Sequence, residues 1–297
     1  MGLLALLWGS SFLWIKLALQ GFSPVQIALI RSVLGAGLLI VLCLATRQYL
    51  PRERWVWGHM LVAATFGNVI PFTLFGVGEQ TVDTGIAGVL NATTPLFALL
   101  IGIGLGTERS ASPVRIGGLL LGFAGVLLIF APWQTAGLVS WGALALLAAA
   151  ASYAICYSYV GRFVSGRAAT PTALSATQLI TAVGLTALTV PVAGTQPVRF
   201  SVLAVVAVAI LGIFGTGLAF VLNYRLIADE GATNATTVGY LLPVVSVLLG
   251  AAVLGEDLNL RVIAGMLVVL VGVAMTRARP RARVTNPEPA LATAGTT

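Results

Sequence analysis

The stretch NATTPLFALLIGIGLGTE, residues 91–108, has a counterpart 148 residues further along the chain, GYLLPVVSVLLGAAVLGE, residues 239–256. Each stretch has a proline at its fifth position, then an apolar run, then a glutamate at its end. Apolar runs in this chain, such as Leu99–Gly106, do not alternate with polar residues as the strands of a membrane barrel do. In lipid, such a span satisfies its own backbone hydrogen bonds as a helix. The two stretches therefore predict a pair of related transmembrane helices.

The composition extends this interpretation to the whole chain. The sequence is 58% hydrophobic and 8% charged, whereas a soluble domain has about 25% charged residues. The net charge of +7 does not indicate a nucleic-acid partner, because the charges lie between the apolar runs and in the C-terminal tail. Cys43 and Cys156 both fall inside apolar runs, which favours packing over a disulfide or a metal pair. The run from residue 2 lacks a basic start and a cleavage signal, which predicts a retained helix.

Ten stretches have the roughly 20 residues that a helix needs to cross a bilayer. If the N-terminus is cytoplasmic, twelve arginines lie on the inner side and only Arg199 and Arg261 on the outer side. By the positive-inside rule, this bias predicts a multi-pass protein of the inner (plasma) membrane with both termini in the cytoplasm. The predicted spans are residues 2–20, 24–46, 56–78, 84–106, 113–131, 139–161, 171–192, 200–223, 232–254 and 260–277.

Further matches at nearly the same shift indicate an internal repeat. Phe66-Gly67 aligns with Phe214-Gly215 at a shift of 148, and Arg31 aligns with Gln178 at a shift of 147. Each half has five predicted helices, and because five is odd the second half enters the membrane from the opposite face. We therefore predict an all-α membrane protein of ten transmembrane helices in two inverted five-helix repeats, with a substrate site between them near the midplane. The repeats cover residues 1–131 and 139–278, and a basic, then disordered, cytoplasmic tail covers 279–297.

This pattern resembles the EamA-type family of the drug/metabolite transporter superfamily. The resemblance covers about residues 1–278, and the repeated spacing from proline to glutamate is its most specific part. It implies a ten-helix transporter of small metabolites, often amino acids, usually moved outward. The residues that carry it are Trp8-Gly9-Ser10-Ser11-Phe12, Lys16, Arg31, Gly85–Pro95 leading to Glu108, and Ala232–Pro243 leading to Glu256.

The paired prolines point to the site. Pro95 and Pro243 each fall near the middle of a predicted span, where proline removes a backbone hydrogen bond and kinks the helix. The carbonyls of Asn91 and Gly239 should be left partly free, and in a membrane they need water, a neighbour or a ligand. The alternative is a packing kink in which threonine side chains satisfy these carbonyls.

Polar residues near the kinks are candidates for the lining of the transport pathway, or alternatively for hydrogen bonds that join helices. These residues are Asn68, Asn91, Thr94, Asn223 and Tyr240. Trp8 and Trp14 lie on the first predicted span, and Tyr153 and Tyr157 share one face of the sixth. Such aromatic residues could form walls for a zwitterion with an apolar side chain, or could simply pack in the core.

Two basic residues fall inside predicted spans. Intramembrane charges usually face a cavity or a partner, so Lys16 and Arg31 either attract a substrate carboxylate or pair with Glu79 and Asp83. Lys16 lies near a helix end and could also extend to the membrane surface. Glu79 could carry a proton or could equally be solvated, which leaves proton antiport and facilitated diffusion open.

Two further patterns concern structure rather than transport. Glu108 and Glu256 end matched spans, which favours a structural role at helix ends. The motif Gly118-x-x-x-Gly122 permits close helix contact and is compatible with a monomer or a weak homodimer.

The function class follows from these features together. The chain has no Walker A pattern. Its only histidine, His59, lies at the inner end of the third predicted span, and no predicted span has a carboxylate near its middle. We therefore predict a secondary transporter that works by alternating access, with no enzymatic activity, no cofactor and no bound metal. Small metabolites such as amino acids are the leading substrates, hydrophobic drugs are the alternative, and a channel is the third class.

Overall fold

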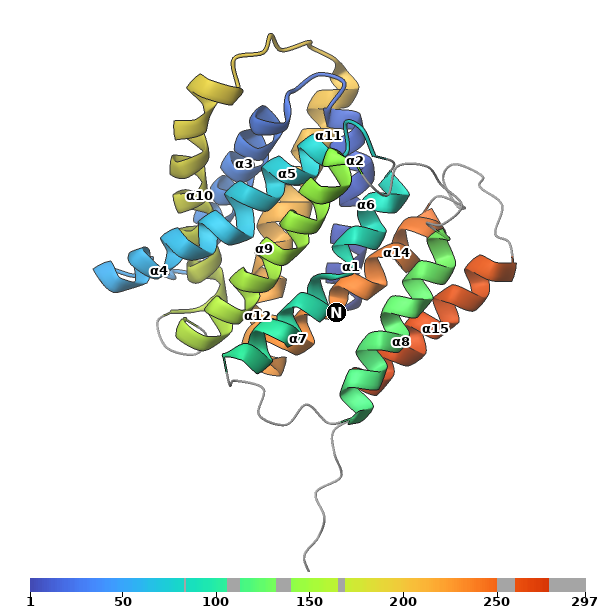
Figure 1. The fold of residues 1–297 in the computed structure, drawn as a ribbon. Coiled ribbons are helices and arrows are strands. Elements are labelled where there is room, and N and C mark those ends of the chain that lie inside the picture. Colours follow the sequence, from blue (N-terminus) through green and yellow to red (C-terminus); the bar gives the residue numbers. More distant parts are fainter. Residues whose placement is uncertain (83, 106–112, 132–139, 165–168, 250–259, 278–297) are drawn as a thin grey trace, which may run out of the picture.

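The computed structural model describes residues 1–297 except 83, 106–112, 132–139, 165–168, 250–259 and 278–297. All regular elements in the described residues are helices (Figure 1). They are α1 (Gly2–Gly9), α2 (Ser11–Ala18), α3 (Pro24–Ala45), α4 (Arg54–Ala64), η1 (Thr65–Val69), α5 (Ile70–Gly78), α6 (Thr84–Asn91), α7 (Thr94–Gly104), α8 (Pro113–Phe130), α9 (Trp141–Phe163), α10 (Pro171–Ala193), α11 (Val202–Gly212), η3 (Ile213–Leu218), α12 (Ala219–Glu230), α13 (Ala232–Thr236), α14 (Val238–Leu249) and α15 (Leu260–Arg277).

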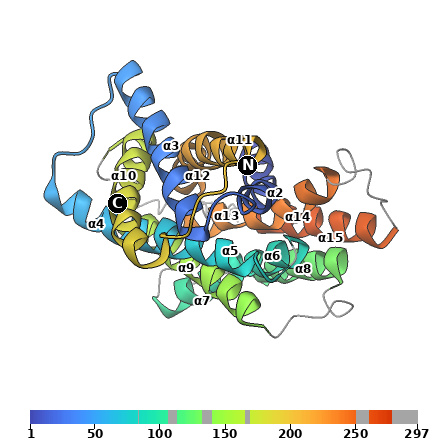
Figure 2. The same ribbon diagram turned by 90° about the horizontal axis from the view of Figure 1, so that it is seen from above.

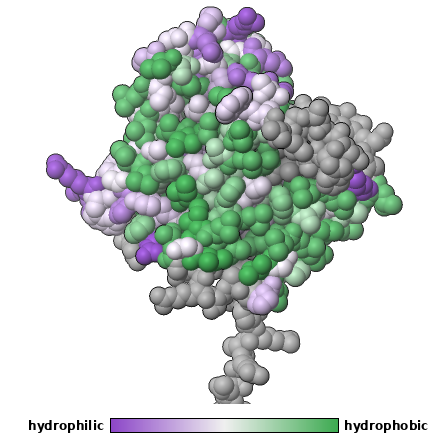
Figure 3. Space-filling model, viewed as in Figure 1, coloured by the Kyte–Doolittle hydropathy of each residue, from purple (hydrophilic) through white to green (hydrophobic). Residues whose placement is uncertain are grey.

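In the described part of the chain, five helices are long and apolar enough to cross a membrane: Pro24–Ala45, Arg54–Gly78, Trp141–Phe163, Pro171–Ala193 and Val202–Glu230. Large apolar side chains lie exposed along them, and Figure 3 shows apolar residues over most of one face, with hydrophilic residues at its upper end and left tip. Patches of this extent suit contact with lipid. The chain is a membrane protein whose described residues form only helical elements. Four of the five other predicted spans contain shorter apolar helices, so the count of ten stays a prediction.

The helix starts follow from local sequence. Ser23 caps α3: its hydroxyl accepts from the Gln26 backbone N–H at 3.4 Å, and its own N–H donates to Gln26 Oε1 at 2.9 Å. Pro24 then occupies the first turn, where its missing N–H breaks no helical bond. Thr170 and Pro171 repeat the cap and the proline at the start of α10.

Three predicted spans are broken rather than continuous. The first breaks at Ser10 between α1 and α2, the fourth at Ala92 and Thr93 between α6 and α7, and the ninth at Thr237 between α13 and α14. The predicted kink at Pro95 takes the form of a break directly before it, because Pro95 lies in the first turn of α7 and not inside a continuous helix. Pro243 does lie inside a helix, α14.

Two other spans contain a π-helical turn at matched positions. The turn η1 interrupts the helix from Arg54 to Gly78, and η3 interrupts the helix from Val202 to Glu230. Each turn contains one of the Phe-Gly pairs that align at a shift of 148. Such turns widen a helix locally and are frequent at functional sites.

Helices α8 and α15 run side by side at one edge of the molecule (Figures 1 and 2). A Cβ atom built on Gly272 would lie 2.4 Å from the Gly122 nitrogen and 2.7 Å from the Gly118 carbonyl oxygen. The motif Gly118-x-x-x-Gly122 therefore serves contact within the chain, where small residues let two backbones approach closely.

Candidate functional site

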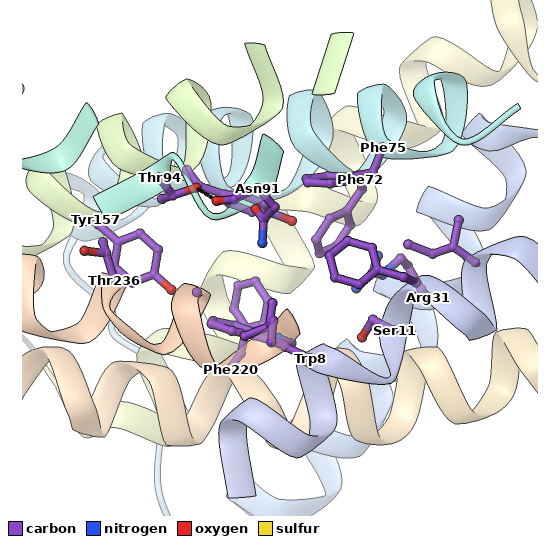
Figure 4. Close-up of a pocket in the computed structure, with 15 residues that line it drawn as sticks. Trp8, Ser11, Arg31, Phe72, Phe75, Asn91, Thr94, Tyr157, Phe220 and Thr236 are labelled. Atoms are coloured by element: carbon purple, nitrogen blue, oxygen red, sulfur yellow. Dashed lines mark hydrogen bonds between the residues drawn. The ribbon is translucent and has the colours of Figure 1, made fainter. Parts of the chain in front are cut away.

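A cavity of about 80 Å³ lies among the broken helices and the two spans with π turns (Figure 4). At roughly 10–15 Å³ for each enclosed water, it holds about six waters, close to the size of a small metabolite. It is lined by Trp8, Ser11, Phe12, Ile15, Arg31, Phe72, Phe75, Asn91, Thr94, Tyr153, Tyr157, Phe220, Thr236, Gly239 and Leu242.

Arg31 on α3 provides the positive charge of the cavity. Its side chain is 5% exposed, and its Nε donates to Thr216 Oγ1 on η3 at 3.0 Å. The guanidinium lies over the ring of Phe72, 3.6 Å from the ring centroid. Among the described residues, no carboxylate forms an ion pair with Arg31. A buried guanidinium has five N–H donors and suits planar anions such as a carboxylate.

Aromatic rings form half of the remaining wall. Phe220 on α12 meets Trp8 and Phe72 edge to face, with ring centroids 6.5 and 6.3 Å apart. Phe75 lies 5.9 Å from Tyr153 on α9. These pairs come from different helices, so the rings both hold the helices together and present an apolar surface to the cavity.

Asn91 and Thr94 bring polar groups to the wall of the cavity that α6 and α7 form. They lie on either side of the break between α6 and α7, and Figure 4 shows the Asn91 amide directed into the space. Thr94 Oγ1 donates to the Asn91 carbonyl at 2.7 Å. A threonine thus satisfies this carbonyl, as the alternative interpretation of the kink expected, while the Asn91 side chain remains turned to the cavity.

A second cavity of about 30 Å³ adjoins the first, and both are lined by Trp8, Tyr153, Tyr157 and Phe220. Its far wall contains Asn223 and a hydrogen-bonded group centred on Gln178.

In that group, Gln178 Nε2 donates to Asn68 Oδ1 at 2.6 Å and to the Ala63 carbonyl at 3.1 Å. The Tyr224 hydroxyl donates to Gln178 Oε1 at 2.5 Å. Neither Asn68 Nδ2 nor Asn223 Oδ1 has a hydrogen-bond partner in the described part of the chain.

Helices α1 and α9 contact the π turns through side-chain hydrogen bonds that are distant in sequence. Trp8 Nε1 on α1 donates to the Gly215 carbonyl of η3 at 3.1 Å, and Ser152 Oγ on α9 donates to the Phe66 carbonyl of η1 at 2.7 Å. These side chains satisfy carbonyls at places where the regular helical bonding is interrupted. Trp8, which lines both cavities, thus contacts η3, and Gly67 of η1 lines the smaller cavity.

The structure gathers six of the predicted site residues around the main cavity and places a seventh, Asn223, at the smaller one. Asn68 lies behind the smaller cavity through its bond to Gln178. Tyr240 packs against Gly122 in a separate apolar cluster with α8 and α15. The remaining predicted residues, Trp14, Lys16, Pro95 and Pro243, line neither cavity.

Sequence reasoning missed several lining residues, chiefly Phe72, Phe75 and Phe220. Nothing in an apolar run distinguishes a phenylalanine at a cavity from one in the core. Gln178 does have a signal in the sequence, because it aligns with Arg31 at a shift of 147. Glu108, Glu256 and Asp83 lie outside the described residues.

Glu79 is buried, although its sequence position just after a predicted span is compatible with exposure to solvent. It follows α5 directly and is 0% exposed, which rules out the solvated side chain that was one alternative. Lys16 Nζ donates to the main-chain carbonyl of Glu79 at 3.0 Å, not to its carboxylate. The predicted ion pair of Lys16 or Arg31 with Glu79 is therefore absent from the described residues.

Comparison with known proteins places this arrangement among transporters. The chain is 28% identical over 262 residues to the uncharacterized inner membrane transporter YedA of Escherichia coli K12, covering 86% of this chain and 82% of YedA. It is 26% identical over 271 residues to the uncharacterized transporter YdfC of Bacillus subtilis, covering 91% and 87%. A crystal structure with 21% identity superimposes with a TM-score of 0.75 over 93% of this chain and 94% of the other, which shows a shared fold.

The match to a protein family spans nearly the whole sequence. Residues 1–131 and 140–278 both match the family described as EamA-like transporters. Together with a helical body suited to lipid and a cavity lined by the buried cation Arg31, this match establishes the class of the molecule. The chain is a membrane transporter and belongs to the EamA-like transporter family.

Proposed function

We propose that this chain is a secondary transporter that exports small carboxylate-bearing metabolites such as amino acids by alternating access. The substrate occupies the main cavity, with its carboxylate on Arg31 and its apolar part against the aromatic wall. The proposal includes no chemical conversion, metal or cofactor. It places both termini in the cytoplasm and needs one chain, either alone or in a weak homodimer.

The observation that carries this proposal is the environment of Arg31. A buried cation without an anionic partner is costly, and the described residues give it one neutral hydrogen bond and one aromatic face. A substrate carboxylate would supply both the missing charge and the missing acceptors. The amide of Asn91, which is directed into the cavity, suits the substrate's second polar group.

Alternating access requires two halves that can exchange conformations. Two hydrogen bonds support this view: Arg31 donates to Thr216 on η3, and Gln178 donates to Asn68 on η1. Arg31 aligns with Gln178 at a shift of 147, and Asn68 aligns with Thr216 at a shift of 148. Each predicted half thus reaches the π turn of the other half by an equivalent bond, as a pseudo-twofold arrangement of two repeats requires.

Export of hydrophobic compounds is the second candidate, and the aromatic wall favours it. A cavity that holds about six waters is small for a drug-sized molecule, and an uncharged compound would leave Arg31 without an anion. Dependence on Arg31 therefore distinguishes the two candidates.

Counterflow in proteoliposomes tests the proposal. Purified protein is reconstituted, loaded with one unlabelled amino acid or drug at a time, and assayed for uptake of the labelled compound. We expect at least one small amino acid to exchange, R31Q to lose most of that exchange and R31K to retain part of it. Exchange of drugs but of no amino acid, equal in wild type and R31Q, would refute the carboxylate site and favour the second candidate.

A further inference from the structure

Glu79 is a buried carboxylate that the proposed transport site does not use. Its side chain is 0% exposed, and neither Oε1 nor Oε2 has a hydrogen-bond partner among the described residues. It lines neither cavity. An ionised carboxylate in such a place lacks both water and hydrogen-bond donors, so its charge depends on nearby cations.

The cations near Glu79 come from two helices. Lys16 on α2 donates to the Glu79 main-chain carbonyl at 3.0 Å, and Arg31 on α3 interacts with the carboxylate through space without an ion pair. On α9, Tyr153 interacts with Arg31. Helix α6 has no titratable side chain in its sequence, and Asp83 lies outside the described residues. The charge of Arg31 thus acts through space on Glu79 and, at the cavity, on whatever binds there.

We propose that Glu79 takes up a proton when a carboxylate binds Arg31, so that occupancy of the cavity and protonation of Glu79 are thermodynamically linked. This inference rests on the proposed function and adds a proton-binding residue to it. A bound carboxylate cancels the positive charge of Arg31 as seen from Glu79. The Glu79 carboxylate then takes a proton from water to become a neutral carboxylic acid, with no change in redox state.

The position of Glu79 sets the pH range of this linkage. Glu79 lies one residue beyond the Arg54–Gly78 span, and burial raises its pKa to about 8, against the lowering effect of Lys16 and Arg31. Near this pH, the side chain is divided between its charged and neutral forms and can respond to a change at Arg31. Because linkage is reciprocal, protonation of Glu79 must also tighten carboxylate binding.

An infrared pH titration of the ligand-free protein tests the connection directly. The carbonyl band of the protonated Glu79 carboxyl is isolated as the difference between wild type and E79Q, with E53Q as the control for loss of an exposed carboxylate. We expect the band to disappear with a midpoint near pH 8 and to be retained in E53Q. R31Q should raise the midpoint by up to about one pH unit, since an opposite charge nearby lowers a carboxyl pKa, and R31K should restore it.

An unchanged midpoint in R31Q, or no Glu79 band at pH 6, would overturn the inference.

A second experiment measures proton uptake at pH 8 in weak buffer when L-leucine is added, with tryptophan fluorescence reporting binding through Trp8. Wild type should take up a fraction of a proton per L-leucine bound, and E79Q should take up none. Binding of L-leucine without proton uptake would refute the linkage and leave the proposed function intact. Absence of L-leucine binding would count against the proposed substrate class, and the infrared midpoints would then decide the linkage.

Discussion

Replacing Gly272 by alanine should weaken the pairing of α8 and α15. The added Cβ would lie 2.4 Å from the Gly122 nitrogen and 2.7 Å from both the Gly118 oxygen and the Gly122 Cα. These atoms belong to the backbone and cannot turn aside, so the two helices must separate by about 1 Å to reach ordinary contact. A gap of this size loses about a quarter to a half of the dispersion energy across it.

From such overpacking we expect the unfolding free energy to fall by about 1–3 kcal/mol. The measurement is denaturant unfolding of the purified protein in detergent, followed by tryptophan fluorescence and by size-exclusion chromatography. Gly117 on α8 is the matched control, because a Cβ there would meet only the Met275 methyl at 3.7 Å. G117A should stay within about 0.5 kcal/mol of wild type.

Equal stability of G272A and wild type would refute this account of the helix pair. A G272A protein of unchanged stability that lost a dimer would show that the glycine face joins two chains instead. The experiment thus separates a contact within the chain from the intermolecular use of Gly118-x-x-x-Gly122.

Three further predictions concern the polar groups and the prolines. Q178L should lower the unfolding free energy by about 1–3 kcal/mol, because it leaves Asn68 Oδ1 without a donor among the described residues and leaves the Tyr224 hydroxyl with only Met60 Sδ as an acceptor; Y224F, which removes only one hydroxyl, should cost about 1 kcal/mol. Burial raises the pKa of Glu79 from 4.5 to about 8, so the folded state keeps a proton that the unfolded chain releases. Stability should therefore fall as pH rises between these values, and pH-dependent unfolding should show no such slope in E79Q. P243A should slow counterflow several-fold, because it restores a helical N–H inside α14, whereas P95A should leave counterflow near wild type, because Pro95 starts α7.

Much of the helix layout was predictable from the sequence because lipid imposes a simple rule on apolar length. The helices α3, α8, α10 and α15 agree with their predicted spans to within a residue or two. The breaks were not predictable, since Ser10 and Thr93 have no strong effect on local helix propensity. They depend on tertiary contacts around the cavity that a single sequence does not encode locally.

The same distinction explains the candidate site. Arg31 was identifiable because a charge inside a span is rare and needs a reason. Glu79 was misjudged as equally able to be solvated, because its position at a span boundary says nothing about which helices cover it. In the structure, the Glu79 side chain is buried, and the Lys16 amine donates a hydrogen bond to the Glu79 main-chain carbonyl.

The two equivalent hydrogen bonds differ in one respect that bears on mechanism. Arg31 and Gln178 occupy aligned positions, yet only Arg31 is charged and lies at the larger cavity, while Gln178 lies at the smaller one. If the halves exchange conformations, the larger cavity closes on the Arg31 side and the smaller one opens on the Gln178 side. A carboxylate held by Arg31 would then have no second cation among the described lining residues of the smaller cavity. On that side, no protein cation among the described lining residues would hold the carboxylate back from release. We therefore expect Q178R, which adds a cation there, to slow exchange rather than to accelerate it.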